Sequence, residues 1–207
     1  SVYGNGKYNI LAKLPNAFPP KMVGTMRYAE TVRLDPAAGQ PVAYNLFRCG
    51  SIFDPNYTGV GHQPYAHDTY QSIYTHYRVL SSKITATFCP NGTSSLGHIV
   101  GGIYISPDTA TPVLDFDLVR ERGQGNFKIC PDQTSTITVS QKYTADKNYP
   151  NNVSNLNSAF GSNPTEDAYF VVWTTSANDT LDPSSTDVVI TIEYEVLMWE
   201  LKSLPES

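Results

Sequence analysis

A strict alternation of apolar and polar residues constrains the fold of this chain more than any other feature of its sequence. Across Asp187–Leu201, Glu193 and Glu195 fall on one face of an extended strand, and the other face is apolar. The residues of that apolar face are Val188, Ile190, Ile192, Tyr194, Val196 and Met198. Side chains alternate between the two faces of a strand, whereas a helix repeats about every 3.6 residues. We therefore predict a strand with one buried face.

Seven other segments carry the same period in weaker form. Lys21–Leu34 and Tyr77–Phe88 each gather their apolar residues on one side. These sides consist of Met22, Met26, Tyr28, Val32 and Leu34 in the first segment and of Leu80, Ile84, Ala86 and Phe88 in the second. The remaining predicted strands are Pro41–Cys49, His98–Ile105, Asn126–Cys130, Ser135–Gln141 and Ala168–Thr175.

The connections between these segments are rich in turn-forming residues. Pro131-Asp132 is a turn signal, and it predicts that Asn126–Cys130 pairs with Ser135–Gln141. Only Asp68–Tyr77 has enough sequence without glycine or proline to form a short helix. The longest connections are Gly50–His76, Ser106–Gly125 and Lys142–Asp167. Connections of this length are usually functional or form interfaces.

Strands with one apolar face must bury those faces against one another, which predicts two facing sheets in a single domain. Strands joined alternately by short and long loops are typical of a jelly roll, an architecture shared by viral capsid proteins, lectins and cupins. The fold class that we expect is all-β: an eight-stranded antiparallel jelly-roll β-sandwich with long loops and one short helix.

The charge of the chain limits its partners. Its 19 acidic and 14 basic residues give a formal net charge of −5, which argues against a surface that grips phosphates unaided. Basic residues nevertheless outnumber acidic ones near the beginning, where Lys7, Lys13 and Lys21 occur. Lysines at such positions either face nucleic acid or block unwanted pairing at an edge strand, and the sequence leaves both interpretations open.

The ends and the cysteines bear on the cellular setting. No apolar run approaches the roughly 18 residues needed to cross a bilayer. The start lacks both an initiator Met and an apolar signal core, so we expect a processed or trimmed chain that is not secreted through a signal peptide. Cys49, Cys89 and Cys130 cannot all pair with one another, and we expect small, reduced, buried side chains.

No arrangement of residues in the sequence predicts catalysis. There is no Gly-x-Ser-x-Gly elbow for a nucleophilic serine. The spacing of His62 and His67 suits two ligands of one metal neither on a strand nor on a helix. We therefore expect these histidines, together with His76 and His98, to form hydrogen bonds in loops.

Carboxylates in the loops leave a structural calcium ion open. Asp115 and Asp117 fall on one side of an expected extended segment, and Asp54 and Asp68 lie in one long connection. Hard cations bind several oxygens from flexible loops. Solvated carboxylates are the simpler interpretation, so we predict no metal site and no other cofactor.

One segment, Phe47–Pro64, is highly individual. Together with Tyr77–Val79 and Ser82–Ile84 it resembles the capsid proteins of small circular Rep-encoding single-stranded DNA (CRESS DNA) viruses. Phe18–Lys21 and Gln141–Tyr143 look like further features of that family. The chain departs from the pattern at a position where the family leads us to expect aspartate and this sequence has asparagine, residue 56. Coat proteins of some small positive-strand RNA viruses share parts of the pattern, so an RNA genome remains an alternative.

The resemblance implies a structural protein of the virion, made in the host cytoplasm or nucleus, with no enzymatic activity. It implies self-assembly into a T=1 icosahedral shell of about 60 copies around a single-stranded DNA genome. It divides the chain into an N-terminal arm root at residues 1–20 and a jelly-roll shell domain at residues 21–207. The genome would be bound by a basic arm before Ser1, with Lys7, Lys13 and Lys21 at its root. The sequence identifies no host receptor.

Subunit contacts are expected from the long connection that follows the second strand. The residues that we expect in this contact loop are Asp54, Pro55, Tyr57, Thr58, Gly59, His62, Gln63, Pro64 and Tyr65. Tyrosines offer large contact areas at a low entropic cost. Packing within the chain is expected to account for about half of the tyrosines in and after this loop.

Two alternatives come from other functional classes. In a carbohydrate-binding β-sandwich, Trp173, Trp199 and the loop tyrosines would stack on sugar rings. Both tryptophans fall within alternating strands, which favours positions in the core or on a sheet face. A metal-dependent cupin-like enzyme is the third hypothesis, and the histidine spacing argues against it.

Overall fold

The two segments with the clearest alternation lie side by side. β1 (Lys21–Leu34) pairs antiparallel with β9 (Thr186–Leu201). β3 (Tyr74–Pro90) pairs with the other edge of β9, and β6 (Ile137–Thr144) pairs with β3, which gives the order β1-β9-β3-β6. The two residues of β7 (Ser158–Ala159) add to β3 outside this path. The computed structural model describes residues 17–36, 42–91, 97–109, 116–123, 125–151, 153–178, 181 and 183–203.

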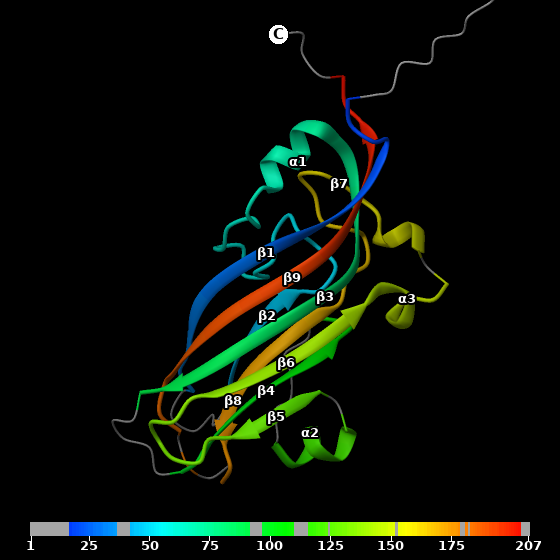
Figure 1. Cartoon of the computed structure of the whole chain (residues 1–207). Helices are drawn as coiled ribbons and strands as arrows, with labels where there is room; N and C mark the ends of the chain where they lie inside the picture. Colours follow the sequence, from blue (N-terminus) through cyan, green and yellow to red (C-terminus); the bar gives the residue numbers. More distant parts are fainter. Residues whose placement is uncertain are drawn as a thin grey trace, which may run out of the picture.

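The second sheet has the order β2-β8-β4-β5 and faces the first (Figure 1). Its strands are β2 (Val42–Arg48), β8 (Tyr169–Ser176), β4 (Ile99–Ser106) and β5 (Asn126–Ile129). All neighbours are antiparallel, and the chain crosses repeatedly from one sheet to the other, as in a jelly roll. The predicted fold class is confirmed, and each predicted strand is present.

The main core lies between the two sheets. The predicted apolar face of β9 is fully buried from Val188 to Met198, as are Tyr28 on β1 and Phe88 on β3. The second sheet contributes Phe47 from β2 among other residues. Burying a large apolar side chain is worth about 1.5–3 kcal/mol, so this double layer is the main source of stability.

Two adjacent glycines let β4 pass between large rings on both of its faces. A Cβ at Gly101 would lie 2.7 Å from the ring of Phe88, and one at Gly102 would lie 2.4 Å from the ring of Trp173. Trp173 belongs to a smaller apolar cluster on the outer face of the second sheet. The helix α2 (Phe116–Arg122) covers this cluster with its buried side chains.

A bulge in β3 overturns one prediction about its core face. The pairing of β3 with β9 shifts register between Val79 and Ser81, and such a shift moves side chains to the opposite face. Val79 and Ile84 are therefore buried, whereas Leu80 is only half-buried. The prediction that Leu80 shares a face with Ile84 was wrong because the bulge inserts one residue into β3, and the alternation of the sequence does not reveal such an insertion.

The predicted pairing of Asn126–Cys130 with Ser135–Gln141 was also wrong. β5 pairs with β4 in the second sheet, whereas β6 pairs with β3 in the first. The two strands still approach each other at the edge of the sandwich, where the Asn126 side chain donates hydrogen bonds to Ser140 O at 2.8 Å and Gln141 Oε1 at 2.7 Å. The turn thus leads from one sheet to the other.

The long connections contain more helix than the sequence predicted. The expected helix is present as α1 (His67–Ile73), but residues 74–77, which were predicted to be helical, belong to β3. Besides α2, the structure contains α3 (Ala145–Asn148) and the 3-10 turn η1 (Val153–Leu156). Asp117 lies in α2 and not in an extended segment, while Asp115 falls outside the described residues. None of the described helices is both long and apolar enough to span a membrane.

Candidate functional site

The connection between β2 and α1, here called the β2–α1 loop (residues 49–66), is the part of the chain singled out by sequence. Its first residues are tied back to the sheet by backbone hydrogen bonds. Arg48 N donates to Pro55 O at 2.8 Å, Tyr57 N donates to Leu46 O at 3.0 Å, and Cys49 N donates to Ala168 O at 2.7 Å. The loop therefore leaves the sandwich in one defined direction.

A buried carboxylate holds the base of this loop. Asp167 Oδ1 accepts hydrogen bonds of 2.8 Å from the backbone N–H groups of Gly50 and Ala168. Asp167 Oδ2 lies 3.7 Å from Arg48 Nη1. Burial raises the pKa of Asp167 from 3.8 to about 7, although these N–H groups and Arg48 act in the opposite direction.

The Arg48 guanidinium links this base to the outer part of the loop. It lies over the rings of Tyr57 and Tyr169, at 5.2 Å and 5.5 Å from their centroids, and Nη1 donates to Tyr169 Oη at 3.2 Å. The two rings also meet edge to face at 5.4 Å. Such cation–π contacts stabilise the arrangement further, so Tyr57 is held in place although it is 40% exposed.

Asn56, where the resemblance led us to expect aspartate, forms hydrogen bonds through both atoms of its amide. Asn56 Nδ2 donates to Glu30 Oε2 at 2.9 Å, and Asn56 Oδ1 accepts from the N–H and the hydroxyl of Thr58 at 3.1 Å and 2.8 Å. Tyr28 Oη donates to the same Glu30 oxygen. An aspartate at position 56 would place a second carboxylate against Glu30, whereas asparagine supplies the donor that Glu30 needs.

The outward half of the loop is held against β1. His62 stacks on the Tyr28 ring with centroids 4.8 Å apart. A Cβ at Gly61 would lie 2.5 Å from Tyr28 Oη, so glycine is required for this close approach. Tyr65 N donates to Arg27 O at 3.2 Å.

The structure sorts the predicted contact residues into two groups. Pro55 and Pro64 are buried, and Asp54 and Gln63 are half-buried. The exposed residues are Tyr57, Thr58, Gly59, His62 and Tyr65. Val60, which is not among the predicted contact residues, is 82% exposed, and Tyr65 is 89% exposed. By contrast Tyr74 and Tyr77 are buried, as expected for about half of these tyrosines.

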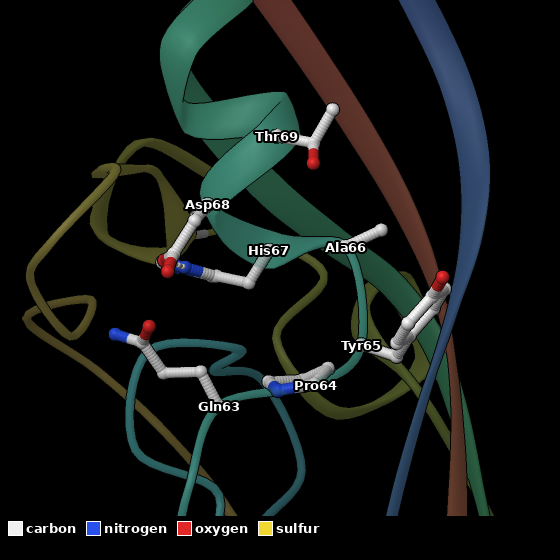
Figure 2. Close-up of a pocket in the computed structure, with 7 residues that line it drawn as sticks. All are labelled: Gln63, Pro64, Tyr65, Ala66, His67, Asp68 and Thr69. Carbon is white, nitrogen blue, oxygen red and sulfur yellow. Dashed lines mark hydrogen bonds and ion pairs between the residues drawn. The ribbon is translucent and has the colours of Figure 1, made fainter.

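A shallow hollow of about 350 Å³ lies where the loop enters α1 (Figure 2). The buried His67 ring lies beside Asp68, with His67 Nδ1 3.1 Å from Asp68 Oδ1, and Phe160 packs edge to face on the ring. Figure 2 shows Tyr65 pointing away from His67, towards β1. One continuous segment, from Gln63 to Thr69, lines the hollow.

The other side chains that could act as a nucleophile or a metal ligand form contacts within the fold. The Ser51 hydroxyl is buried and lies 3.1 Å from Tyr77 Oη and 2.6 Å from Asn163 Oδ1. His98 Nδ1 lies 3.2 Å from Cys130 O. The expectation that all four histidines lie in loops was wrong for His67, which begins α1, and for His76, which lies in β3. Within the described ranges, no three His, Cys, Asp or Glu side chains gather at a point that could hold a metal ion.

The cysteines are unpaired, and Cys49 and Cys130 are buried, whereas Cys89, which was also expected to be buried, is half-buried. Burial raises the pKa of the Cys49 thiol well above its usual value and that of Cys130 to about 11. Thiols that stay protonated are poor nucleophiles. These two cysteines therefore act as small apolar side chains.

The predicted basic residues divide between the described and undescribed parts of the chain. Lys21 is exposed at the start of β1, whereas Lys7 and Lys13 fall outside the described residues. Arg27 forms an ion pair with Glu193 on β9, with Nε 2.9 Å from Oε1. Arg33 donates to Ser185 Oγ at 2.7 Å.

The two tryptophans occupy different environments. Trp173 is 1% exposed, so it has no face with which to stack on a sugar. Trp199 is half-buried on the open face of the first sheet. The expectation that both belong to the core or to a sheet face is confirmed.

No protein-family model and no curated protein matches the chain. Solved structures do match, among them Desmodium yellow mottle tymovirus (14% identity, 94% of this chain and 97% of that chain, TM-score 0.44). The BFDV capsid protein in a decameric crystal structure matches at 11% identity over 86% of this chain and 99% of that chain, with a TM-score of 0.48. A virus-like particle of the Macrobrachium rosenbergii nodavirus matches at 12% identity over 90% and 95%, with a TM-score of 0.45.

Proposed function

We propose that the chain is a structural capsid protein that self-assembles into a small icosahedral shell around a viral genome. The β2–α1 loop carries the proposal: its base is tied into the sandwich by Asp167 and Arg48, and its outer part exposes Tyr57, Val60 and Tyr65. A preorganised loop loses little entropy on contact, and exposed aromatic side chains suit an interface.

The mechanism is assembly by many copies of a weak contact. A single loop contact is weak, but in a closed shell each subunit makes several at once, and their effects multiply. The jelly-roll sandwich keeps the loops of one subunit at fixed mutual positions. In this proposal the chain is a component of the virion, with no catalytic role and no cofactor. It is made in the host cytoplasm or nucleus.

The finer form of the proposal is a T=1 shell of about 60 copies around single-stranded DNA. Its support is the sequence resemblance of Phe47–Pro64, a segment in which Arg48 and Gly50 hold the base of the loop. Residues 1–20 would form the root of a basic arm on the inner side, and residues 21–207 the shell. An RNA genome is the alternative.

Light scattering and negative-stain electron microscopy of the purified chain test the proposal. We expect uniform spheres whose diameter gives the number of copies. Nuclease digestion of the extracted nucleic acid distinguishes a DNA from an RNA cargo, and deletion of residues 1–20 should reduce the amount retained. A monomer or dimer at every salt and calcium concentration would overturn the capsid function.

A further inference from the structure

A second hollow, of about 480 Å³, opens where β1 begins and β9 ends. The residues that line it are Leu197, Trp199 and Glu200 of β9, Lys21 of β1, Arg78 of β3, and Pro20 and Asn157. In the pairing of the sheet, Lys21 lies opposite Trp199 and Arg78 lies opposite Leu197. Residues at opposite and diagonal positions on one face are close enough to contact the same bound group.

The Trp199 ring is fixed before any ligand arrives. His76, its partner on β3, stacks on it with a centroid distance of 5.7 Å and an interplanar angle of 15°. His76 Nδ1 in turn lies 2.9 Å from Glu200 Oε2. Glu200 has a φ of 63°, in the left-handed region that non-glycine residues rarely adopt. This backbone outlier accompanies the contact between Glu200 and the ring that stacks on Trp199.

The cations beside this ring are available to a ligand. Among the described residues, neither Lys21 nor Arg78 has an acidic side chain within ion-pair distance. On the same sheet Arg27 is paired with Glu193. Lys21 is exposed and Arg78 half-buried, and the carboxylate of Glu200, which also lines the hollow, lies against His76 and not against either cation.

We propose that this hollow binds single-stranded nucleic acid, with a base on the Trp199 ring and adjacent phosphates at Lys21 and Arg78. An aromatic platform flanked by cations is how proteins bind single strands without reading their sequence. A neutral sugar would use the ring but not the cations. The inference rests on the proposed packaging function and assigns it a site on the open face of the first sheet, beginning at Lys21 at the root of the arm.

Tryptophan fluorescence of the full chain gives a direct test, because the chain has two tryptophans and Trp173 is buried. Titration with a deoxythymidine oligonucleotide should quench the Trp199 emission saturably. The variant Lys21→Gln/Arg78→Gln should bind about ten-fold more weakly. Lys83→Gln/Lys142→Gln removes the same charge from a row of the same sheet and should bind within about two-fold of the parent chain.

A second measurement does not depend on the fluorescence of Trp199. Anisotropy of a labelled oligonucleotide should show a loss of about ten-fold for Trp199→Leu, with circular dichroism confirming that the variant is folded. Absence of quenching, equal losses in the two double variants, or equal binding of a sulfated oligosaccharide would overturn the inference. Light scattering on the same samples reports particles separately, so the site can fail while the capsid function stands.

Discussion

The Asp167 carboxylate accepts a hydrogen bond of 2.8 Å from the backbone N–H of Gly50, although 117 residues separate the two in the sequence. The same oxygen accepts from Ala168, at the start of the segment that leads into β8. A Cβ at residue 50 would lie 2.8 Å from this oxygen, so glycine allows the approach. This contact fixes the β2–α1 loop to the second sheet.

The pKa of Asp167 predicts how stability changes with pH. Burial raises this pKa from 3.8 to about 7, so the folded chain holds the proton more tightly than the unfolded chain. The protonated Asp167 side chain therefore stabilises the folded state. Its contribution to the free energy of unfolding is fully present below about pH 4 and is lost as the pH rises to 7. We expect the free energy of unfolding to fall by roughly 2–4 kcal/mol across this range, and Asp167→Asn to remove that fall in urea titrations.

Asp132 supplies a control of opposite sign. Hydrogen bonds from Ser135 and Thr134 lower the pKa of Asp132 to about 2. Its stabilisation is therefore present above about pH 4 and is lost only as the pH falls towards 2. In Asp132→Asn, the free energy of unfolding should therefore fall between pH 4 and 7 by the same amount as in the parent chain. If Asp167→Asn also leaves that fall intact, Asp167 does not cause it.

Replacement of Gly102 by alanine should destabilise the outer cluster of the second sheet. The added methyl would lie 2.4 Å from Trp173 Cζ2, and overpacking of this kind costs about 1–3 kcal/mol. At Gly24 the nearest atom is the flexible Met198 Cε at 3.1 Å, so Gly24→Ala should cost less than about 1 kcal/mol. Equal midpoints of urea unfolding for the two variants would contradict this difference.

Asn56→Asp should be destabilising at neutral pH because it replaces the amide that donates to Glu30. A lost buried hydrogen bond to a charged group costs about 1–3 kcal/mol. Glu30→Gln in the same chain should restore most of this loss, since the amide then offers a donor to the new carboxylate. A double-mutant cycle in urea measures the coupling, and additive losses would argue against a direct contact.

Substitutions at the outer part of the loop should affect assembly and not folding. Val60→Ser and Tyr65→Ser change exposed side chains, so the free energy of unfolding should stay within about 0.5 kcal/mol. The protein concentration needed for particles, followed by light scattering, should rise several-fold. Val189→Thr is the control, because Val189 is 48% exposed on the open face of β9. A larger effect there would place the contact on the sheet face.

Some parts of the molecule follow from the sequence alone. β1 and β9 are long enough for their period of two to show which face is buried, and β1 has the predicted bounds. The segment Phe47–Pro64 predicts the loop, because its prolines fix φ and its glycines allow turns that other residues rarely adopt, whatever surrounds them. These signals are local, so no knowledge of neighbouring strands was needed.

Other features were decided by contacts between distant residues. β5 and β6 join different sheets, the bulge beside Leu80 exchanges the faces of β3, and α2 forms over Trp173. Asp167 acts on Gly50 only because β2 and β8 are paired. The alternation of a strand shows which of its faces is buried, but it does not show which other strand or sheet covers that face. The partner of each strand, and with it the place of each loop, is set by how all the apolar faces pack together.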